Sequence, residues 1–273
     1  MRLRERVHEY IDAVLKHRLS HLFGQPSRLA LLRPALVSQC AVCRSWPSAQ
    51  VCAACIARFS SPLLRCTRCA LALPARLVTD TAACPSDRCA ACIQHAPPLD
   101  EALAALNYVY PWSRLITRFK FGDQPGWAAF FAELMLTAPG VQAVFEALRP
   151  TDFVLPIPLS PQRLQVRGFN QAWELAQALV QRSHTPGAAD ASLLLRVRDT
   201  RAQSELQREA RLANVRDAFQ VDPLRAPLLH GRRVVLVDDV MTSGASVYTA
   251  AQALKAAGAS HISAVVLART PAP

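Results

Sequence analysis

The stretch Arg233-Val-Val-Leu-Val-Asp-Asp-Val-Met-Thr-Ser-Gly-Ala-Ser-Val247 decides the fold of this 273-residue chain. Its first part, Val234–Val237, is continuously apolar and mostly β-branched, which favours a strand covered on both faces of a parallel sheet. Two carboxylates, Asp238 and Asp239, are expected to end the strand, and a turn of small residues follows them. From Val247 onward the apolar residues take helical spacing. The stretch therefore predicts a strand, an acidic pair, a tight turn and the start of a helix.

This order of parts is typical of a phosphate site. Small side chains let backbone N–H groups approach an anion, and the dipole of the following helix favours negative charge. Asp238 and Asp239 would repel a bare phosphate, so we expect them to face sugar hydroxyls or a metal ion. The alternative is a helix-capping turn that binds nothing. Because hydroxyl-bearing residues and Gly244 follow the acids, the phosphate interpretation is favoured, and a mononucleotide or phosphoribosyl compound fits it.

The bulk composition bounds the class of protein. Apolar residues make up 51% of the chain and charged residues 19%, which is typical of a globular protein with a large core. The formal net charge of +11 favours an anionic partner, although arginine-rich surfaces are often only solvated. No run of about 18 uncharged apolar residues predicts a membrane span, and the first residues lack the apolar segment of a signal peptide. We therefore expect a cytoplasmic location.

All nine cysteines lie between Cys40 and Cys92, a clustering that indicates metal binding in a reducing compartment. Each of four Cys-x-x-Cys pairs can direct two sulfurs at one ion, and two pairs complete a tetrahedral shell. The simplest pairing predicts two structural zinc sites, one formed by Cys40, Cys43, Cys52 and Cys55, the other by Cys66, Cys69, Cys89 and Cys92. An interleaved pairing stays open. Cys84 is left over, as a free thiol or as a substitute ligand for Cys89.

The segment before the cysteines is expected to be a helix. From Leu3 to Leu22 the apolar residues form one helical stripe among basic residues. Such a helix most often packs on its own protein, although it can also bind a membrane surface, a partner or DNA. Pro97-Pro98 marks a second boundary. We therefore expect three parts: an N-terminal basic helix or extension at 1–37, a double zinc ribbon at 38–97, and an α/β domain at 98–273.

The third part alternates strand patterns with helical ones, which predicts an open, mostly parallel α/β sheet with flanking helices. The expected strands lie at 103–110, 153–157, 193–197, 234–237 and 262–267. Ligands of such sheets lie beyond the carboxyl ends of the strands. The loop that begins with Pro156-Ile157-Pro158 and the Asp238-Asp239 turn both fall there, so they can line one crevice. Lys120 is expected elsewhere, at the end of a helix.

The motifs, taken in order, resemble the ComF family, a double zinc ribbon fused to a type I phosphoribosyltransferase domain. After the cysteine pairs come Phe119-Lys-Phe-Gly-Asp123, Pro156-Ile-Pro-Leu159 with Arg167-Gly-Phe-Asn-Gln171, Gln203 with Arg211 and Asn214, and Val237-Asp-Asp-Val-Met-Thr-Ser-Gly244. The resemblance covers about Cys40 to Arg269. The turn Met241–Ser246 differs slightly from the family pattern but keeps the hydroxyls and the glycine of that pattern. The segment before Cys40 is longer than is usual in the family.

The resemblance implies binding of phosphoribosyl pyrophosphate (PRPP) with Mg²⁺, and a role linked to natural competence and DNA uptake or processing. It implies that Asp238 and Asp239 hold the ribose hydroxyls, that the turn from Thr242 to Ser246 wraps the 5′-phosphate, and that Lys120, Arg167 and the loop after Pro156 lie near the pyrophosphate. The expected catalytic residues are Asp238, Asp239, Lys120 and Arg167. The full expected PRPP-binding set is Lys120, Pro156, Ile157, Pro158, Arg167, Asp238, Asp239, Val240, Met241, Thr242, Ser243, Gly244, Ala245 and Ser246.

Two functions compete at this point. The first is a phosphoribosyltransferase whose acceptor is unknown, with structural zinc and Mg²⁺ as its metals. The second is a non-catalytic accessory protein that senses PRPP or a nucleotide and binds single-stranded DNA, with proteins of the competence machinery as partners. Few aromatic residues lie among the arginines of the cysteine-rich segment, so the sequence shows no obvious platform for stacked bases.

Overall fold

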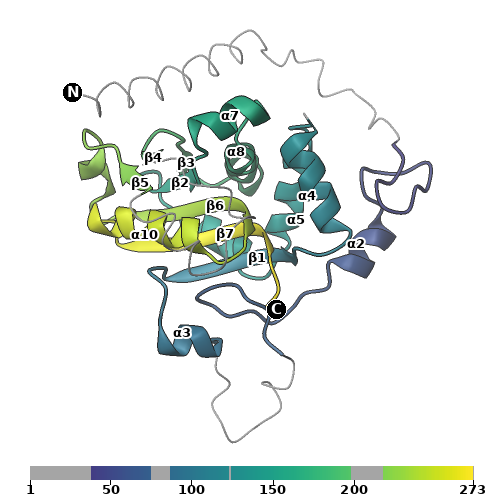
Figure 1. The fold of residues 1–273 in the computed structure, drawn as a ribbon, viewed down its shortest axis with the longest axis horizontal. Helices are drawn as coiled ribbons and strands as arrows, with labels where there is room; N and C mark the ends of the chain where they lie inside the picture. The colour runs from purple at the N-terminus through teal and green to yellow at the C-terminus, as the bar shows by residue number, and fades with distance from the viewer. Residues whose placement is uncertain (1–37, 75–86, 123, 198–217, 273) are drawn as a thin grey trace, which may run out of the picture. The chain divides into compact units, whose positions relative to one another are not determined.

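The computed structural model describes residues 38–74, 87–122, 124–197 and 218–272 (Figure 1). The expected N-terminal helix, Cys84 and the segment with Gln203, Arg211 and Asn214 lie outside the described residues. Packing divides the chain into two compact units, 1–61 and 62–273, so the second cysteine group belongs to the same unit as the sheet. The three-part division at 37/38 and 97/98 stays a prediction. No helix in the described part of the chain is both long and apolar enough to cross a membrane.

The centre of the second unit is a five-stranded parallel sheet of order β1-β7-β6-β2-β3, which confirms the predicted α/β class (Figure 1). Its strands are β1 (Glu101–Asn107), β2 (Phe153–Pro156), β3 (Ala188–Ala189), β6 (Arg233–Met241) and β7 (His261–Arg269). The strand expected at 193–197 is β4 (Leu194–Arg196), and it pairs antiparallel with β5 (Phe219–Val221) in a separate two-stranded sheet. The sequence analysis did not anticipate β5.

Helices precede and separate the strands of the described residues. They are α2 (Ala53–Phe59), α3 (Ala90–Gln94), α4 (Trp112–Phe121), α5 (Trp127–Leu136), α6 (Val141–Glu146), α7 (Pro161–Arg167), α8 (Gln171–Ser183) and α10 (Ala245–Ala256), with a short 3₁₀ helix at Ala226–Leu229. The last helix begins at Ala245, directly after the glycine of the expected phosphate turn.

The strand of the deciding stretch is longer than expected. The two carboxylates do not end β6, which continues through them to Met241. The reason is its neighbour β7, which keeps pairing with β6 from Asp238, opposite Val266, to Met241, opposite Arg269. On the other side β2 ends at Pro156, opposite Val237. Asp238 and the residues after it therefore project past the end of β2.

Helices cover both faces of the sheet. One face shares a buried cluster with α10, with β4 and β5, and with the second cysteine group, represented by Cys66, Cys69 and Cys92. Helices α5 and α8 pack on the sheet but contribute no residue to that cluster, so they cover the other face. The connection from β2 to β3 runs through α8 on this second face, and the connection from β6 to β7 runs through α10 on the first.

The two connections diverge between β2 and β6, which makes this point the topological switch of the sheet. Ligands of open α/β sheets bind in the crevice at such a point, beyond the carboxyl ends of the strands. The loop after Pro156 and the turn after Met241 flank it.

Candidate active site and metal centres

A cavity of about 630 Å³ opens at this switch point. Nine of the expected PRPP-binding residues line it: Lys120, Ile157, Pro158, Arg167, Asp238, Asp239, Val240, Thr242 and Ser246. The other five, Pro156, Met241, Ser243, Gly244 and Ala245, belong to the adjoining strand ends and turn without lining the cavity. The tertiary structure thus brings together residues from α4, α7, β6 and two loops.

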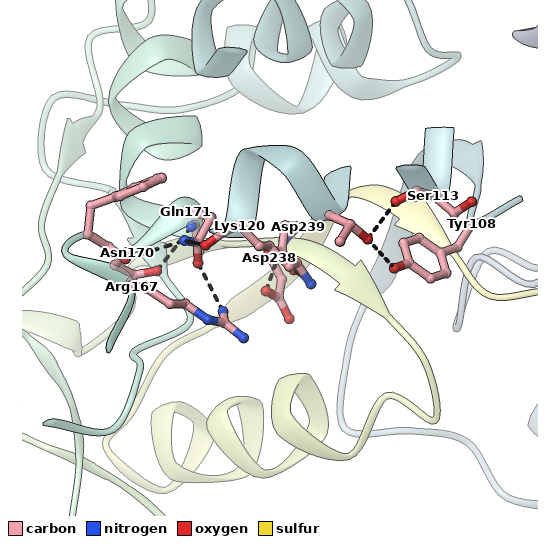
Figure 2. A network of polar contacts seen from close by, with 11 residues as sticks. Tyr108, Ser113, Lys120, Arg167, Asn170, Gln171, Asp238 and Asp239 are labelled. Atoms are coloured by element: carbon pink, nitrogen blue, oxygen red, sulfur yellow. Dashed lines mark hydrogen bonds and ion pairs between the residues drawn. The ribbon is translucent and has the colours of Figure 1, made fainter. Parts of the chain in front are cut away.

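Lys120 lies at the end of helix α4, as expected, and it lines the same cavity as Asp238 and Asp239. Its Nζ is 2.9 Å from Oδ1 of Asp239, and the two side chains are only 17% and 9% exposed. Helix α4 buries Phe119 in the core, and the next residue, Lys120, reaches the end of β6 (Figure 2). The residue pattern alone assigned only strand ends to the crevice, and the ComF resemblance added Lys120; the structure packs the last turn of α4 against those strand ends.

The acidic pair is held in place by its own backbone. The Asp239 N–H donates to Oδ1 of Asp238 at 2.8 Å. Burial in the cavity raises the pKa of Asp238 to about 7, and the charge of Asp239 adds to the increase, while Lys120 and Arg167 oppose it. A carboxyl with a pKa near neutrality can exchange a proton at physiological pH.

The Arg167-Gly-Phe-Asn-Gln171 motif contributes three residues, Arg167, Asn170 and Gln171, to the lining of the cavity. Gly168 ends α7 in the left-handed conformation, at φ 76°, and Asn170 caps α8 by accepting from the Ala172 N–H at 3.0 Å. The buried Gln171 accepts from Arg167 Nη1 at 3.0 Å and donates to the Lys120 carbonyl at 3.3 Å (Figure 2). One buried amide therefore links the Arg167 side chain to the backbone of Lys120.

Arg167 also contacts an aromatic ring. Its guanidinium lies 4.8 Å from the centroid of Phe121, whose side chain is exposed at the cavity. Burial lowers the pKa of Arg167, and the nearby Asp239 partly offsets this. An arginine stays charged under such conditions, so the site keeps a planar cation suited to phosphate oxygens.

The turn at the start of α10 has the features of an anion site. Gly244 adopts φ 83°, and a Cβ there would lie 2.4 Å from the Tyr248 ring and 2.8 Å from the Met241 methyl group. Glycine is therefore required on both conformational and steric grounds. The first N–H groups of α10 have no acceptor within the helix and carry the positive end of its dipole. Thr242 and Ser246 bring hydroxyls to the cavity beside them.

The sequence analysis missed several lining residues. They are Tyr108, Thr117, Gln162, Val166 and Arg196. Arg196 is buried, donates from Nη1 to the Pro158 carbonyl at 3.4 Å, and lies 5.3 Å from the Phe219 ring. A charged residue that directly follows the apolar run Leu193–Leu195 was the available signal.

The structure brings the eight predicted metal-ligating cysteines together in the same two groups of four, each with its sulfurs within 4.8 Å of one another. Sγ of Cys43 lies 3.7 Å from Sγ of Cys52, and Sγ of Cys69 lies 3.6 Å from Sγ of Cys89. Tetrahedral zinc at a Zn–S distance of about 2.3 Å requires sulfurs about 3.8 Å apart. The donor sets therefore fit structural zinc.

Within the first group, backbone amides favour the thiolate form of Cys40, whereas burial raises the pKa of Cys55 to about 12. The Cys52 N–H donates to Sγ of Cys40 at 3.3 Å. Burial raises the pKa of Cys40. The hydrogen bond from Cys52 and those from other backbone donors outweigh burial and bring the pKa of Cys40 to about 6. A thiolate is the form that binds metal.

Comparison with known proteins assigns the family. The phosphoribosyl transferase domain family matches residues 167–273. The DNA utilization protein YhgH of Salmonella typhimurium is 34% identical over 226 residues, which cover 81% of this chain and 90% of that protein. Competence protein F of Haemophilus influenzae is 30% identical, over 67% of this chain and 79% of its own length. The chain belongs to the ComF family.

A third ComF relative, competence protein ComFC of Bacillus subtilis, is 32% identical over 57% of this chain and 58% of its own length. The ComF resemblance of the motifs is thereby confirmed, and so is the phosphoribosyltransferase-like domain with two four-cysteine groups before it. The cavity at the switch point belongs to this ComF domain.

Proposed function

We propose that this ComF protein binds PRPP at the switch-point cavity and transfers its phosphoribosyl group to an acceptor, in a role linked to natural competence and DNA uptake. One observation carries the proposal: an acidic pair, several cationic side chains (among them Lys120 and Arg167) and the start of a helix all face a single cavity of about 630 Å³. A ligand with a phosphate, a diol and a second anionic group is the chemical complement of that arrangement. The matched domain family supports it.

The three parts of PRPP correspond to three parts of the cavity. The 5′-phosphate suits the turn from Thr242 to Ser246, which lies at the positive end of the α10 dipole and brings Thr242 and Ser246 to the cavity. The ribose hydroxyls suit the carboxylates of Asp238 and Asp239. The pyrophosphate suits Arg167 and Lys120, which lie on the wall made by α4 and the α7–α8 loop.

Magnesium would arrive with the pyrophosphate, because Mg²⁺ prefers substrate phosphates and water to a cage of protein ligands. The cavity fits this arrangement, since Lys120 already pairs with Asp239 and the remaining lining groups that suit phosphate are cations and hydroxyls. When bound, the ion would neutralise charge on the leaving pyrophosphate.

In the reaction, the bond from C1 of the ribose to the pyrophosphate oxygen breaks and a bond from C1 to the acceptor forms. Positive charge grows on the sugar and negative charge on the leaving group. Arg167 and Lys120 stabilise the leaving group, and the carboxylates lie near the sugar. Asp238, with its pKa near 7, can accept the proton that the acceptor loses. Most of the rate enhancement comes from positioning.

Calorimetric titration with PRPP, with and without Mg²⁺, tests the proposal. We expect Asp238→Asn/Asp239→Asn to weaken binding at least about a hundredfold, because each carboxylate loses a charge-assisted hydrogen bond. Glu133→Gln is the matched control, because this carboxylate is exposed on α5 and pairs only with Arg182 among the described residues. Equal affinity of the double variant and wild type would contradict the assignment. Pyrophosphate release, screened against bases and amines, then tests turnover.

A non-catalytic protein that senses PRPP or a nucleotide and binds single-stranded DNA is the second candidate. The exposed Phe121, with the Arg167 guanidinium over it, is the observation that favours it, because bases stack on aromatic rings and on arginine. Steeply salt-dependent DNA binding that persists in Asp238→Asn/Asp239→Asn, with no pyrophosphate release for any acceptor, would support this candidate over the transferase.

A further inference from the structure

A buried arginine contacts the start of the turn at 242–246 and is not among the residues that line the cavity. Arg269 is the last residue of β7 and is only 8% exposed. Its Nη1 donates to the Met241 carbonyl at 3.0 Å and also to the Thr242 carbonyl. These two residues are the end of β6 and the first residue of the turn. Arg269 therefore holds the backbone from which the turn starts.

The same guanidinium reaches the second cysteine group. Its Nε donates to the Cys69 carbonyl at 2.9 Å, so one side chain joins a cysteine knuckle to the phosphate turn. That knuckle is itself tied to the sheet, because the Ala102 N–H donates to the Thr67 carbonyl at 2.7 Å and Arg68 Nη1 donates to the Asp100 carbonyl at 2.8 Å. The cysteine group is thus a structural part of the unit that contains the cavity.

Tyr248 forms a second connection between the turn at 242–246 and the second cysteine group. Its ring lies against Gly244, where an added Cβ would approach it to 2.4 Å. The tyrosine also packs against the buried cluster to which Cys66, Cys69 and Cys92 belong. It therefore fills the space between the turn and the group.

The charge of Arg269 explains why metal in the cysteine group should matter for the turn. The hydrogen bonds found for this guanidinium all end on backbone carbonyls, namely those of Cys69, Met241, Thr242 and Thr270. A buried cation held only by dipoles is costly unless a compensating charge is near. Four thiolates around one zinc ion carry a net negative charge, which would supply that compensation.

We propose that Arg269 is a positioning residue through which the Cys66, Cys69, Cys89 and Cys92 group sets the geometry of the phosphate turn. Metal in the group fixes the Cys69 carbonyl and compensates the guanidinium, and the guanidinium fixes the carbonyls of Met241 and Thr242. The N–H groups that follow are then aimed at the phosphate. The inference rests on the proposed PRPP function for its ligand, although not for the coupling itself.

Arg269→Lys tests the proposal, because lysine keeps the charge but cannot bridge the same carbonyls. We expect this variant to bind PRPP with Mg²⁺ at least about tenfold more weakly, with unchanged zinc content by metal analysis. Arg65→Met is the matched control: Arg65 donates to the carbonyl of Ala70 in the same knuckle and does not bond to the turn. The control should bind PRPP within about twofold of wild type. Wild-type affinity in Arg269→Lys would overturn the proposal.

Coupling to the metal is tested by combining Arg269→Lys with Cys92→Ser. If the arginine transmits the effect of the group, Cys92→Ser should weaken PRPP binding about tenfold in wild type and about twofold or less in the Arg269→Lys background. Equal weakening in both backgrounds would overturn the coupling.

Hydrogen exchange separates this inference from the proposed function, because it needs no ligand. The amides of 242–246 should exchange faster in Arg269→Lys, and also in wild type after zinc is removed with a chelator. Unchanged exchange under both conditions would overturn the inference even if PRPP binds. Faster exchange in a protein that does not bind PRPP would overturn the proposed ligand while supporting the coupling.

Discussion

Lys120 and Asp239 form an ion pair of 2.9 Å that joins the last turn of α4 to the carboxyl end of β6. Both side chains are largely buried, so each compensates a charge that the cavity desolvates. The cavity thereby contains a carboxylate and an ammonium already held in position before any ligand arrives. A preorganised pair of this kind reduces the ordering required when an anionic sugar ligand binds.

The strength of this pair can be measured with a double-mutant cycle on Lys120→Met and Asp239→Asn. Lys120→Met leaves a buried carboxylate without its cation, so we expect it to lower the free energy of unfolding by roughly 1–3 kcal/mol at pH 8. Adding Asp239→Asn should recover part of the loss, with a coupling energy of about 1–2 kcal/mol. The exposed pair Arg182–Glu133 is the control and should couple by less than about 1 kcal/mol. Equal coupling in the two pairs would contradict the role given to burial.

Asp238 should make the stability of the ligand-free protein depend on pH. Its pKa rises on folding from 3.8 to about 7, so the folded state binds more protons between these values, and stability falls as the pH rises through this window. Asp238→Asn removes the charge. It should therefore stabilise the ligand-free protein by roughly 1–3 kcal/mol at pH 8 and much less below pH 4. Denaturant unfolding at both pH values checks this, and a uniform effect would contradict the raised pKa.

The same titration should appear in ligand binding. The ionised form of Asp238 accepts hydrogen bonds from ribose hydroxyls, and that form predominates only above about pH 7. We expect PRPP affinity to increase severalfold between pH 6 and pH 8. Asp238→Asn should bind weakly and without this increase. Identical pH profiles for the variant and wild type would assign the titration to another group or to the ligand.

Gly244→Ala should be far more disruptive than Gly168→Ala. Both glycines have positive φ, at 83° and 76°, so both substitutions carry the strain of the left-handed conformation, about 1 kcal/mol. Only at Gly244 does the new Cβ also meet the Tyr248 ring and the Met241 methyl group, whereas nothing lies within 4 Å at Gly168. We expect an additional loss of about 1–3 kcal/mol from the clash at Gly244. Equal melting temperatures for the two variants would contradict this packing.

Metal analysis should find two zinc ions per chain. The two groups of four cysteines each provide a complete set of ligands, so chelation should remove both ions and lower the thermal stability of the protein. Cys40→Ser and Cys66→Ser should each lower the content to about one ion per chain. A wild-type content of zero or one would contradict the two-site arrangement.

Much of the sheet and of the site was predictable because the necessary patterns are local. The apolar run from Val234 and the small-residue turn depend on neighbouring residues only, and β6 and α10 follow from them. The four Cys-x-x-Cys pairs were evident from their spacing, and the simplest of the pairings that the sequence left open is the one that the structure brings together.

The contact of Lys120 with Asp239, the place of Arg196 and the length of β6 could not be predicted from local patterns. Lys120 joins the site because α4 packs with its last turn against the strand ends. Arg196 joins it because β4 pairs with a strand that the sequence did not reveal. Strand β6 continues to Met241 because β7 accompanies it. Each depends on contacts between segments far apart in the chain.

By itself, the sequence determined the α/β class, the acidic pair with the small-residue turn after it and the four Cys-x-x-Cys pairs, since each is encoded by spacing over a few residues. Only the tertiary structure decided that Lys120 pairs with Asp239, that Arg196 lines the cavity, and that Arg269 joins the second cysteine group to the turn. The physical reason is that burial and charge compensation are set by whichever distant elements pack together, and local spacing carries no record of those contacts.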